Sequence, residues 1–168
     1  MPFTPLHMGA GLAFKSIKPA RFSLMTFGFT QVLIDLEPAY FMYQQESHLH
    51  RINHTFLGAI LIIIVGVLIG KPLCSWMLKF WNSRLSPAQM KLLAVNPNIT
   101  WSTATVGVVI GSFSHVILDG IMHWDVKPFY PFWSVNPFLG FISIQQLHMG
   151  CILAGVFGGM WLLIHRIF

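Results

Sequence analysis

The sequence predicts an all-α fold, in which a polytopic helical membrane protein is formed by a single integral membrane domain over residues 1–168. Composition is the first reason, because 55% of the residues are hydrophobic and only 9% are charged, whereas soluble domains carry roughly 25% charged residues. The second is a set of apolar stretches close to the length of about 20 residues that crosses a bilayer as a helix. The third is chain length, since 168 residues suit one domain.

Four stretches are expected to be transmembrane spans, and a short N-terminal helix at residues 4–18 precedes them. The spans cover residues 22–43, 53–70, 100–123 and 140–164. The first span contains Asp35, Glu37 and Pro38. Because a proline disfavours the helical conformation of the residue before it, we expect this helix to break there.

An interfacial helical segment is expected at residues 71–95. Trp76, Trp81 and several charged residues are mixed there with apolar positions, as in an amphipathic helix that lies on a membrane surface. Ser86 followed by Pro87 is typical of a helix start, so a second short helix is expected to open within this segment.

The distribution of lysine and arginine predicts the orientation in the membrane. Only Arg51 and Lys127 map to one side, which we expect to be external together with the loops 44–52 and 124–139. The other eight cations map to the cytoplasmic side: Lys15, Lys18, Arg21, Lys71, Lys79, Arg84, Lys91 and Arg166. The net charge of +5 is scattered over element ends and forms no basic stripe, so nucleic-acid binding is not expected.

Acidic residues and histidines gather on the external side, although the topology was assigned from lysine and arginine alone. The acids are Asp35, Glu37, Glu46, Asp119 and Asp125, which are all the acids in the chain. The histidines are His48, His50, His54, His115, His123 and His148. His7 joins them if residues 4–18 descend from the external face, and this is the arrangement that we favour.

The spacing within this group indicates a metal site. Asp119 lies four residues after His115 and four before His123, so a helix places the three side chains along one face. His50 and His54 repeat this spacing at the start of another span. Imidazole and carboxylate ligands without thiolate are a common hydrolytic set for Zn²⁺ or another divalent first-row metal.

Plainer explanations exist for each member of the group. His115 with Asp119 fits a helix-stabilising pair, and Asp125 fits a cap or turn in its loop. His48 fits a solvated loop residue. A metal site explains the set at once, because ionisable groups inside a span are costly unless they are paired or bind a metal. This set contains Asp35, His54, His115, Asp119, His123 and His148.

Asp35 and Glu37 are the candidate catalytic residues. A regular helix would point them to nearly opposite sides, and the expected break at Pro38 would let both reach the cluster. Asp35 is the candidate general base or metal ligand. Glu37 is expected beside the ligands or near the substrate.

Arg51 and Lys127 flank the expected cluster as the only external cations. Either side chain could hold a substrate phosphate, and arginine offers bidentate geometry. Contact with lipid headgroups is the alternative. His50 and Asp125 are candidate additional metal ligands.

At these residues the chain resembles the bacterial membrane-bound metal-dependent hydrolases, in particular the LexA-binding inner-membrane hydrolase family. The resemblance covers most of the chain and lies in the segments TPLHMGAG, IDLEP, HRINHTFLG, GSFSHVILDGIMHWDVKP and NPFLGFISIQQLH. That family is distantly similar to zinc-dependent phospholipase C and the single-strand zinc nucleases. Their ligands follow the order His, Asp, His, His-x-x-x-Asp, His and His-x-x-x-Glu.

The resemblance implies a set of metal ligands in this chain. In the same order stand His7, Asp35, His54, His115 with Asp119, His123 and His148. Ile152 occupies the position of the final glutamate. The resemblance therefore implies one or two zinc ions around Asp119 and leaves a third in doubt.

These observations predict a zinc-dependent hydrolase of the bacterial inner membrane, with its active site toward the periplasm. The expected substrate is a phosphoester that is a lipid or is linked to one, and membrane lipid is the expected partner. Two alternatives remain open. One is a metal-ion transporter, since acids and histidines in spans also line ion pathways. The other is a non-catalytic metal-binding membrane scaffold.

Overall fold

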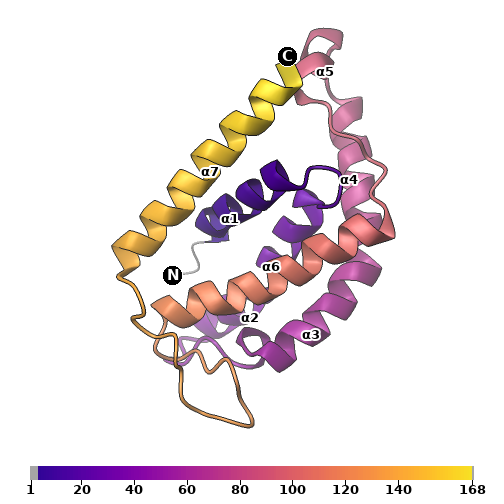
Figure 1. Cartoon of the computed structure of the whole chain (residues 1–168). Helices are drawn as coiled ribbons and strands as arrows, with labels where there is room; N and C mark the ends of the chain where they lie inside the picture. Colours follow the sequence, from indigo (N-terminus) through magenta and orange to yellow (C-terminus); the bar gives the residue numbers. More distant parts are fainter. Residues whose placement is uncertain (1–3, 168) are drawn as a thin grey trace.

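The computed structural model describes residues 4–167, and these residues form helices and connecting loops without a strand (Figure 1). The all-α prediction is confirmed for this part of the chain. The elements in chain order are α1 (Thr4–Ile17), α2 (Leu24–Tyr43), the 3₁₀-helix η1 (Ile52–His54), α3 (Phe56–Val65), the π-helical η2 (Gly66–Gly70), α4 (Lys71–Ser83), α5 (Pro87–Leu93), α6 (Trp101–Met122) and α7 (Ile144–Ile167).

Hydroxyl side chains cap the starts of four of these helices, as the chemistry of their unpaired N–H groups requires. Ser23 accepts from the N–H of Thr26 at the start of α2, and Thr55 and Thr100 cap α3 and α6 in the same way. Ser86 and Gln89 form a reciprocal capping box at α5. The predicted helix start at Ser86 and Pro87 is therefore confirmed.

Within residues 4–167, three helical stretches are long and apolar enough to cross a membrane: Phe56–Ser83, Trp101–Met122 and Ile144–Arg166. The four spans of the sequence prediction must be corrected, because α2 does not meet this criterion. The reason is its polar content. Thr26, Thr30, Gln31 and Asp35 are all buried on α2, which packs in the centre of the bundle against α6.

The span predicted at residues 53–70 is longer in the structure, because α3, η2 and α4 form one continuous helical stretch of 28 residues. Pro72 lies at the start of α4 and cannot donate a backbone hydrogen bond. The wider π-turn of η2 comes immediately before it and accommodates this loss. The interfacial segment 71–95 is consequently not one element. Residues 71–83 extend the span, and only α5 is a separate short helix.

The expected helix break at Pro38 is also wrong, since α2 continues through this proline to Tyr43. Proline removes one hydrogen bond, the one to the carbonyl of Ile34, and the rest of the helix is kept. Pro38 and Ile34 are both buried, so packing holds the helix together across the missing bond.

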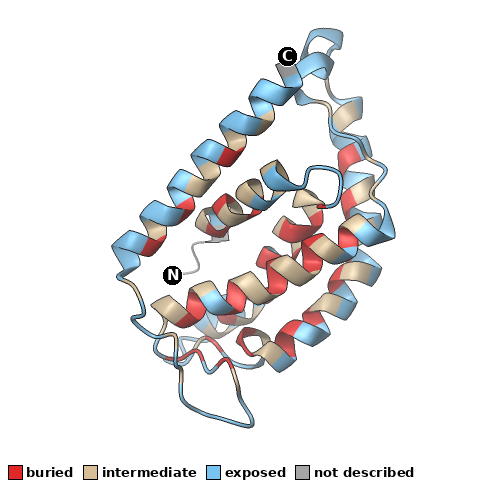
Figure 2. Cartoon of the chain, in the orientation of Figure 1, coloured by how far each residue is buried: buried red, intermediate tan, exposed pale blue. Residues whose placement is uncertain are grey.

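The C-terminal ends of α2 and α6, the start of α3 and the two loops 44–51 and 123–143 lie at one end of the bundle (Figure 1). Buried residues concentrate on α2, α6 and the first turns of α3 (Figure 2). At the other end, Arg166 donates to the carbonyl of Ala94, which joins the end of α7 to the segment after α5. The end of α7 and α5 therefore lie at the opposite end of the bundle from the loops 44–51 and 123–143 (Figure 1).

Helix α7 packs mainly against α1 and has little other contact with the bundle. The two backbones approach closely at Gly9, where an added Cβ would lie 1.9 Å from the carbonyl oxygen of Cys151. Gly158 approaches Leu12 in the same manner. Small residues at such crossings let membrane helices pack backbone to backbone. This contact fixes α1, which carries His7 toward the end of the bundle where α6 ends.

Candidate metal centre

Three elements that are distant in the sequence supply the centre of a buried cluster. Helix α2 contributes Asp35, η1 contributes His54, and α6 contributes His115 and Asp119 one turn apart. The capped start of α3 fixes His54, because Thr55 accepts from Gly58 N–H and donates to the carbonyl of Ile52. The side chains of His54 and His115 are fully buried.

One ligand atom from each of these four residues lies within 4.8 Å of the other three. His54 Nε2 and His115 Nε2 are each 3.2 Å from Asp119 Oδ2. Asp35 Oδ1 is 3.2 Å from His115 Nε2 and 3.8 Å from His54 Nε2. Four donor atoms therefore surround one small volume.

These separations are compatible with a metal ion between the four residues. His54 Nε2 and His115 Nε2 are buried and have no hydrogen-bond partner in the described part of the chain, despite the nearby carboxylates. Four ligands at the usual zinc distances of about 2.0–2.1 Å would lie about 3.3 Å apart in a tetrahedron. Four of the six separations, at 3.2 to 3.8 Å, are close to this value, and all six are within 4.8 Å.

Asp119 also lies near two further histidines. His7 Nε2 is 3.4 Å from its Oδ1, and His50 Nε2 is 4.0 Å from its Oδ2. His7 is therefore at the cluster end of the bundle, as the favoured arrangement of residues 4–18 predicts. His123, the C-cap of α6, stacks on His50 with ring centroids 4.3 Å apart.

A second group of candidate ligands consists of His50, His123 and Asp125 and adjoins the first through Asp119. The two groups bring together most of the predicted site residues. Their roles as metal ligands stay a prediction. His148 on α7 is half-buried and belongs to neither group found among residues 4–167.

Acceptors outside the cluster hold the histidine rings. His54 Nδ1 lies 3.5 Å from Glu37 Oε2, and His50 Nδ1 lies 2.9 Å from Asp125 Oδ1. Glu37 thus lies behind His54, on the side away from Asp35. Glu37 therefore lies beside the cluster, as predicted, but it reaches this position from an unbroken α2 and not through a helix break.

Gln31 is a residue of the site that the sequence analysis missed. Its side chain is fully buried, its Oε1 lies 2.8 Å from His115 Nδ1, and its Nε2 donates to the carbonyl of Gly111. The sequence contained one signal for it. Gln31 precedes Asp35 by four residues, so both side chains share one face of α2.

The pKa values of loop residues reflect these contacts. Burial, together with His54 and His123, lowers the pKa of His50 to about 4, so its ring is neutral at pH 7. Burial opposes ionisation of Asp125, but the N–H groups and ring of His50 outweigh it and hold the pKa of Asp125 below its ordinary value. Burial also opposes protonation of His54, yet the surrounding carboxylates raise its pKa to about 10 without a metal.

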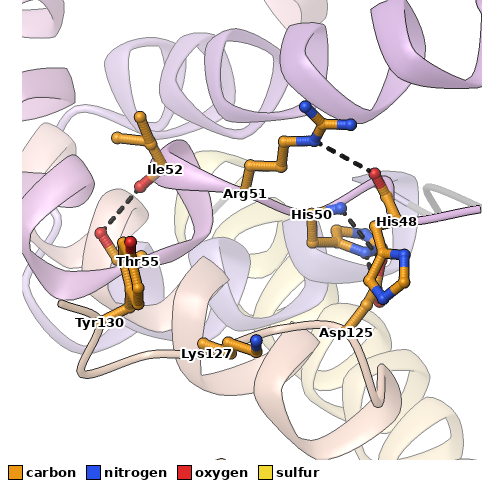
Figure 3. A pocket seen from close by; sticks show the side chains of 8 residues that line it. All are labelled: His48, His50, Arg51, Ile52, Thr55, Asp125, Lys127 and Tyr130. Carbon is orange, nitrogen blue, oxygen red and sulfur yellow. Dashed lines mark hydrogen bonds and ion pairs between the residues drawn. The ribbon is translucent and has the colours of Figure 1, made fainter. Parts of the chain in front are cut away.

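A cavity of about 370 Å³ opens beside this second group (Figure 3). Its lining includes both predicted phosphate ligands, Arg51 and Lys127, on opposite sides. The guanidinium of Arg51 is already engaged, since it pairs with Glu46, stacks over Phe41 and donates to the carbonyl of His48. The exposed Lys127 forms no ion pair with any residue from 4 to 167. Of the two cations, Lys127 is the more available to an anion in the cavity.

No family model, curated protein or solved structure matches this chain. The function must therefore be inferred from the geometry of the buried cluster and of the cavity beside it.

Proposed function

We propose that this chain is a membrane-embedded metal-dependent hydrolase that uses one or two Zn²⁺ ions, or another divalent first-row metal, to cleave a phosphoester. The observation that carries the proposal is the convergence of His54, His115, Asp35 and Asp119 within 4.8 Å. Two imidazoles and two carboxylates without a thiolate are a ligand set of hydrolytic zinc sites. The resemblance to the bacterial membrane-bound hydrolases points the same way.

All four residues would hold the metal, and one of them, Asp35, is also the candidate general base. A bound zinc ion would supply Lewis-acid polarisation of a phosphoryl oxygen and would acidify a water molecule. Asp35 lies at the edge of the cluster with its side chain 10% exposed, the most of the four, so it is the residue placed to accept a proton. Asp119 lies within 4.0 Å of the Nε2 atoms of four histidines and would be the central ligand.

The proposed substrate is a lipid or a lipid-linked phosphoester. Large aromatic side chains are exposed around the same end of the bundle: Tyr43, Trp124, Phe132, Trp133 and Phe141. Aromatic residues of this kind favour the boundary between membrane and water. A cavity at this level, with Lys127 on its wall, is accessible to a phosphorylated headgroup.

The proposed location is the bacterial inner membrane, with the site toward the periplasm. The sequence analysis assigns all five acids to the side of the membrane that contains the cluster, and eight of the ten cations to the opposite side. The positive-inside tendency then places the cluster outside. The confinement of acids to one end also favours an enzyme over a metal transporter, which would need polar groups along the whole pathway.

Metal analysis of the purified protein, with assays on a panel of phosphoesters and phospholipids, tests the proposal. Wild type is expected to contain zinc and to cleave at least one ester, and Asp119→Ala is expected to lose both. Glu46→Gln is the matched control for zinc content, because Glu46 is an exposed acid outside the cluster. Metal-replete protein that cleaves no ester, or that carries Zn²⁺ into proteoliposomes, would overturn the enzymatic proposal.

A further inference from the structure

Three buried histidines share one arrangement. Each turns Nδ1 toward an acceptor outside the cluster and Nε2 toward Asp119. The pairs are His50 with Asp125 at 2.9 Å, His54 with Glu37 at 3.5 Å and His115 with Gln31 at 2.8 Å. The three acceptors come from two parts of the chain, α2 and the loop after α6. A histidine can bind a metal through Nε2 only when the proton of the neutral ring is on Nδ1.

The hydrogen bonds of Gln31 settle where the proton of His115 lies. The carbonyl of Gly111 can only accept, so the amide nitrogen of Gln31 must face it, at 2.9 Å. The amide oxygen of Gln31 then faces His115 Nδ1 and can only accept from it. The neutral His115 ring therefore carries its proton on Nδ1, and the lone pair on Nε2 points at Asp35 and Asp119.

Glu37 and Asp125 are also acceptors for a histidine ring, and backbone N–H groups hold both carboxylates in place. Glu37 accepts from the N–H groups of Arg51 and Asn53. Asp125 accepts from the N–H groups of Leu49 and His50 through Oδ2, and from the His50 ring through Oδ1. Both carboxylates are thus held in place by backbone N–H groups of the loop 44–51 and η1.

We propose that Gln31, Glu37 and Asp125 are positioning residues that fix the Nδ1–H tautomer of His115, His54 and His50, so that every Nε2 is available to the metal. This inference rests on the proposed metal centre. It assigns Asp125 to ring orientation instead of metal ligation, and Glu37 to ring orientation instead of contact with the substrate. Outer partners of metal-bound histidines commonly act in this way.

Gln31 offers the sharpest test, because its acceptor can be removed or retained. Gln31→Leu removes the acceptor, and we expect the Kd for Zn²⁺ to rise about 10- to 100-fold, the usual cost of losing an outer partner. Gln31→Glu keeps an acceptor opposite His115 Nδ1 but gives up the donor to the Gly111 carbonyl, so it should bind Zn²⁺ more tightly than Gln31→Leu and less tightly than wild type. Thr26→Val is the matched control, since Thr26 is buried on α2 and donates to a carbonyl of α6 without contacting a histidine.

Nuclear magnetic resonance of the metal-free protein gives a readout that needs neither metal nor activity. Long-range ¹H–¹⁵N spectra of the imidazoles, recorded at a pH where each ring is neutral, should show the proton on Nδ1 of His50 and His115. Gln31→Leu should shift His115 toward the Nε2–H form and leave His50 unchanged. An Nε2–H tautomer in wild type, or an unchanged Kd in Gln31→Leu, would overturn the inference. Correct tautomers in a protein that binds no zinc would instead refute the proposed metal centre alone.

Discussion

Gly58→Ala should damage the metal centre without changing any candidate ligand. Gly58 lies in the first turn of α3, directly against η1, which carries His54. A Cβ at this position would lie 1.8 Å from the carbonyl oxygen of Ile52 and 3.0 Å from the Cα of Asn53. Both are backbone atoms, so no side-chain rotation can relieve the overlap.

The size of the required shift follows from the same contact. Real Cβ contacts are essentially never shorter than 3.0 Å, so the Ile52 carbonyl must move by more than about 1 Å. The carbonyl also accepts from Thr55, whose hydroxyl caps α3, and this cap would be strained as well. Metal–ligand distances tolerate only about 0.2 Å. His54 would consequently leave the coordination sphere.

The assay is a competition titration of Zn²⁺ against a chromogenic chelator, with thermal unfolding measured in parallel. Losing a hydrogen-bond partner of a metal ligand raises the Kd about 10- to 100-fold, and we expect the Kd of Gly58→Ala for Zn²⁺ to rise by at least as much. Turnover should fall by about 100-fold. Gly150→Ala and Gly159→Ala are matched controls in α7, where an added Cβ meets nothing within 4 Å. Wild-type affinity in folded Gly58→Ala would show that His54 does not bind the metal.

Three further predictions concern protons, the cavity and α7. The carboxylates raise the pKa of His54 to about 10, so metal binding must displace its proton. The Kd for Zn²⁺ should therefore fall about tenfold per pH unit between about pH 6 and pH 8. Calorimetry in buffers of different ionisation enthalpy should detect the released proton, and a pH-independent Kd would contradict the prediction. Lys127→Gln should raise KM for a phosphoester by about tenfold or more, the cost of one charge-assisted hydrogen bond, without changing the zinc content. Arg51→Gln should raise KM less, because Glu46 and Phe41 already hold its guanidinium. Equal increases in KM would refute the distinction between the two cations. His148→Ala should bind zinc more tightly than His54→Ala, because only His54 belongs to the group that surrounds Asp119; the reverse order in equilibrium dialysis would favour the ligand set implied by the resemblance.

The helical class and the membership of the cluster were predictable from the sequence, because both depend on composition and on residue spacing within one helix. Apolar composition excludes a water-facing surface, and the spacing of His115 and Asp119 places them on one face of a helix whatever its neighbours are. The lysine and arginine bias separated the two ends. These signals are local or cumulative, and tertiary packing does not alter them.

The path of the helices was less predictable, because packing overrides local preferences. The bias of Glu37 before Pro38 indicates a break, but burial of Pro38 and Ile34 keeps α2 intact. The polar and aromatic residues after Gly70 indicate a surface segment, yet the π-turn lets the helix run on to Ser83. Neither compensation is visible in a local window of sequence.

Residue roles within the site depended on contacts between distant segments. By residue type Asp125 is a candidate metal ligand and Glu37 a candidate catalytic residue. Their backbone donors come from residues 49–53, and no spacing rule links these positions. Gln31 was missed because a neutral amide on an apolar helix usually marks packing. Only the pairing with Gly111 and His115 gives it a role at the site.

Zinc X-ray absorption spectroscopy of the purified, zinc-loaded protein tests the central claim most directly. The account predicts a first shell of nitrogen and oxygen atoms at about 2.0–2.1 Å, with the outer-shell scattering of at least two imidazoles. Asp119→Ala should lose this spectrum, and the Glu46→Gln control should keep it. A first shell with sulfur at about 2.3 Å, or protein that retains no zinc after dialysis, would contradict the account.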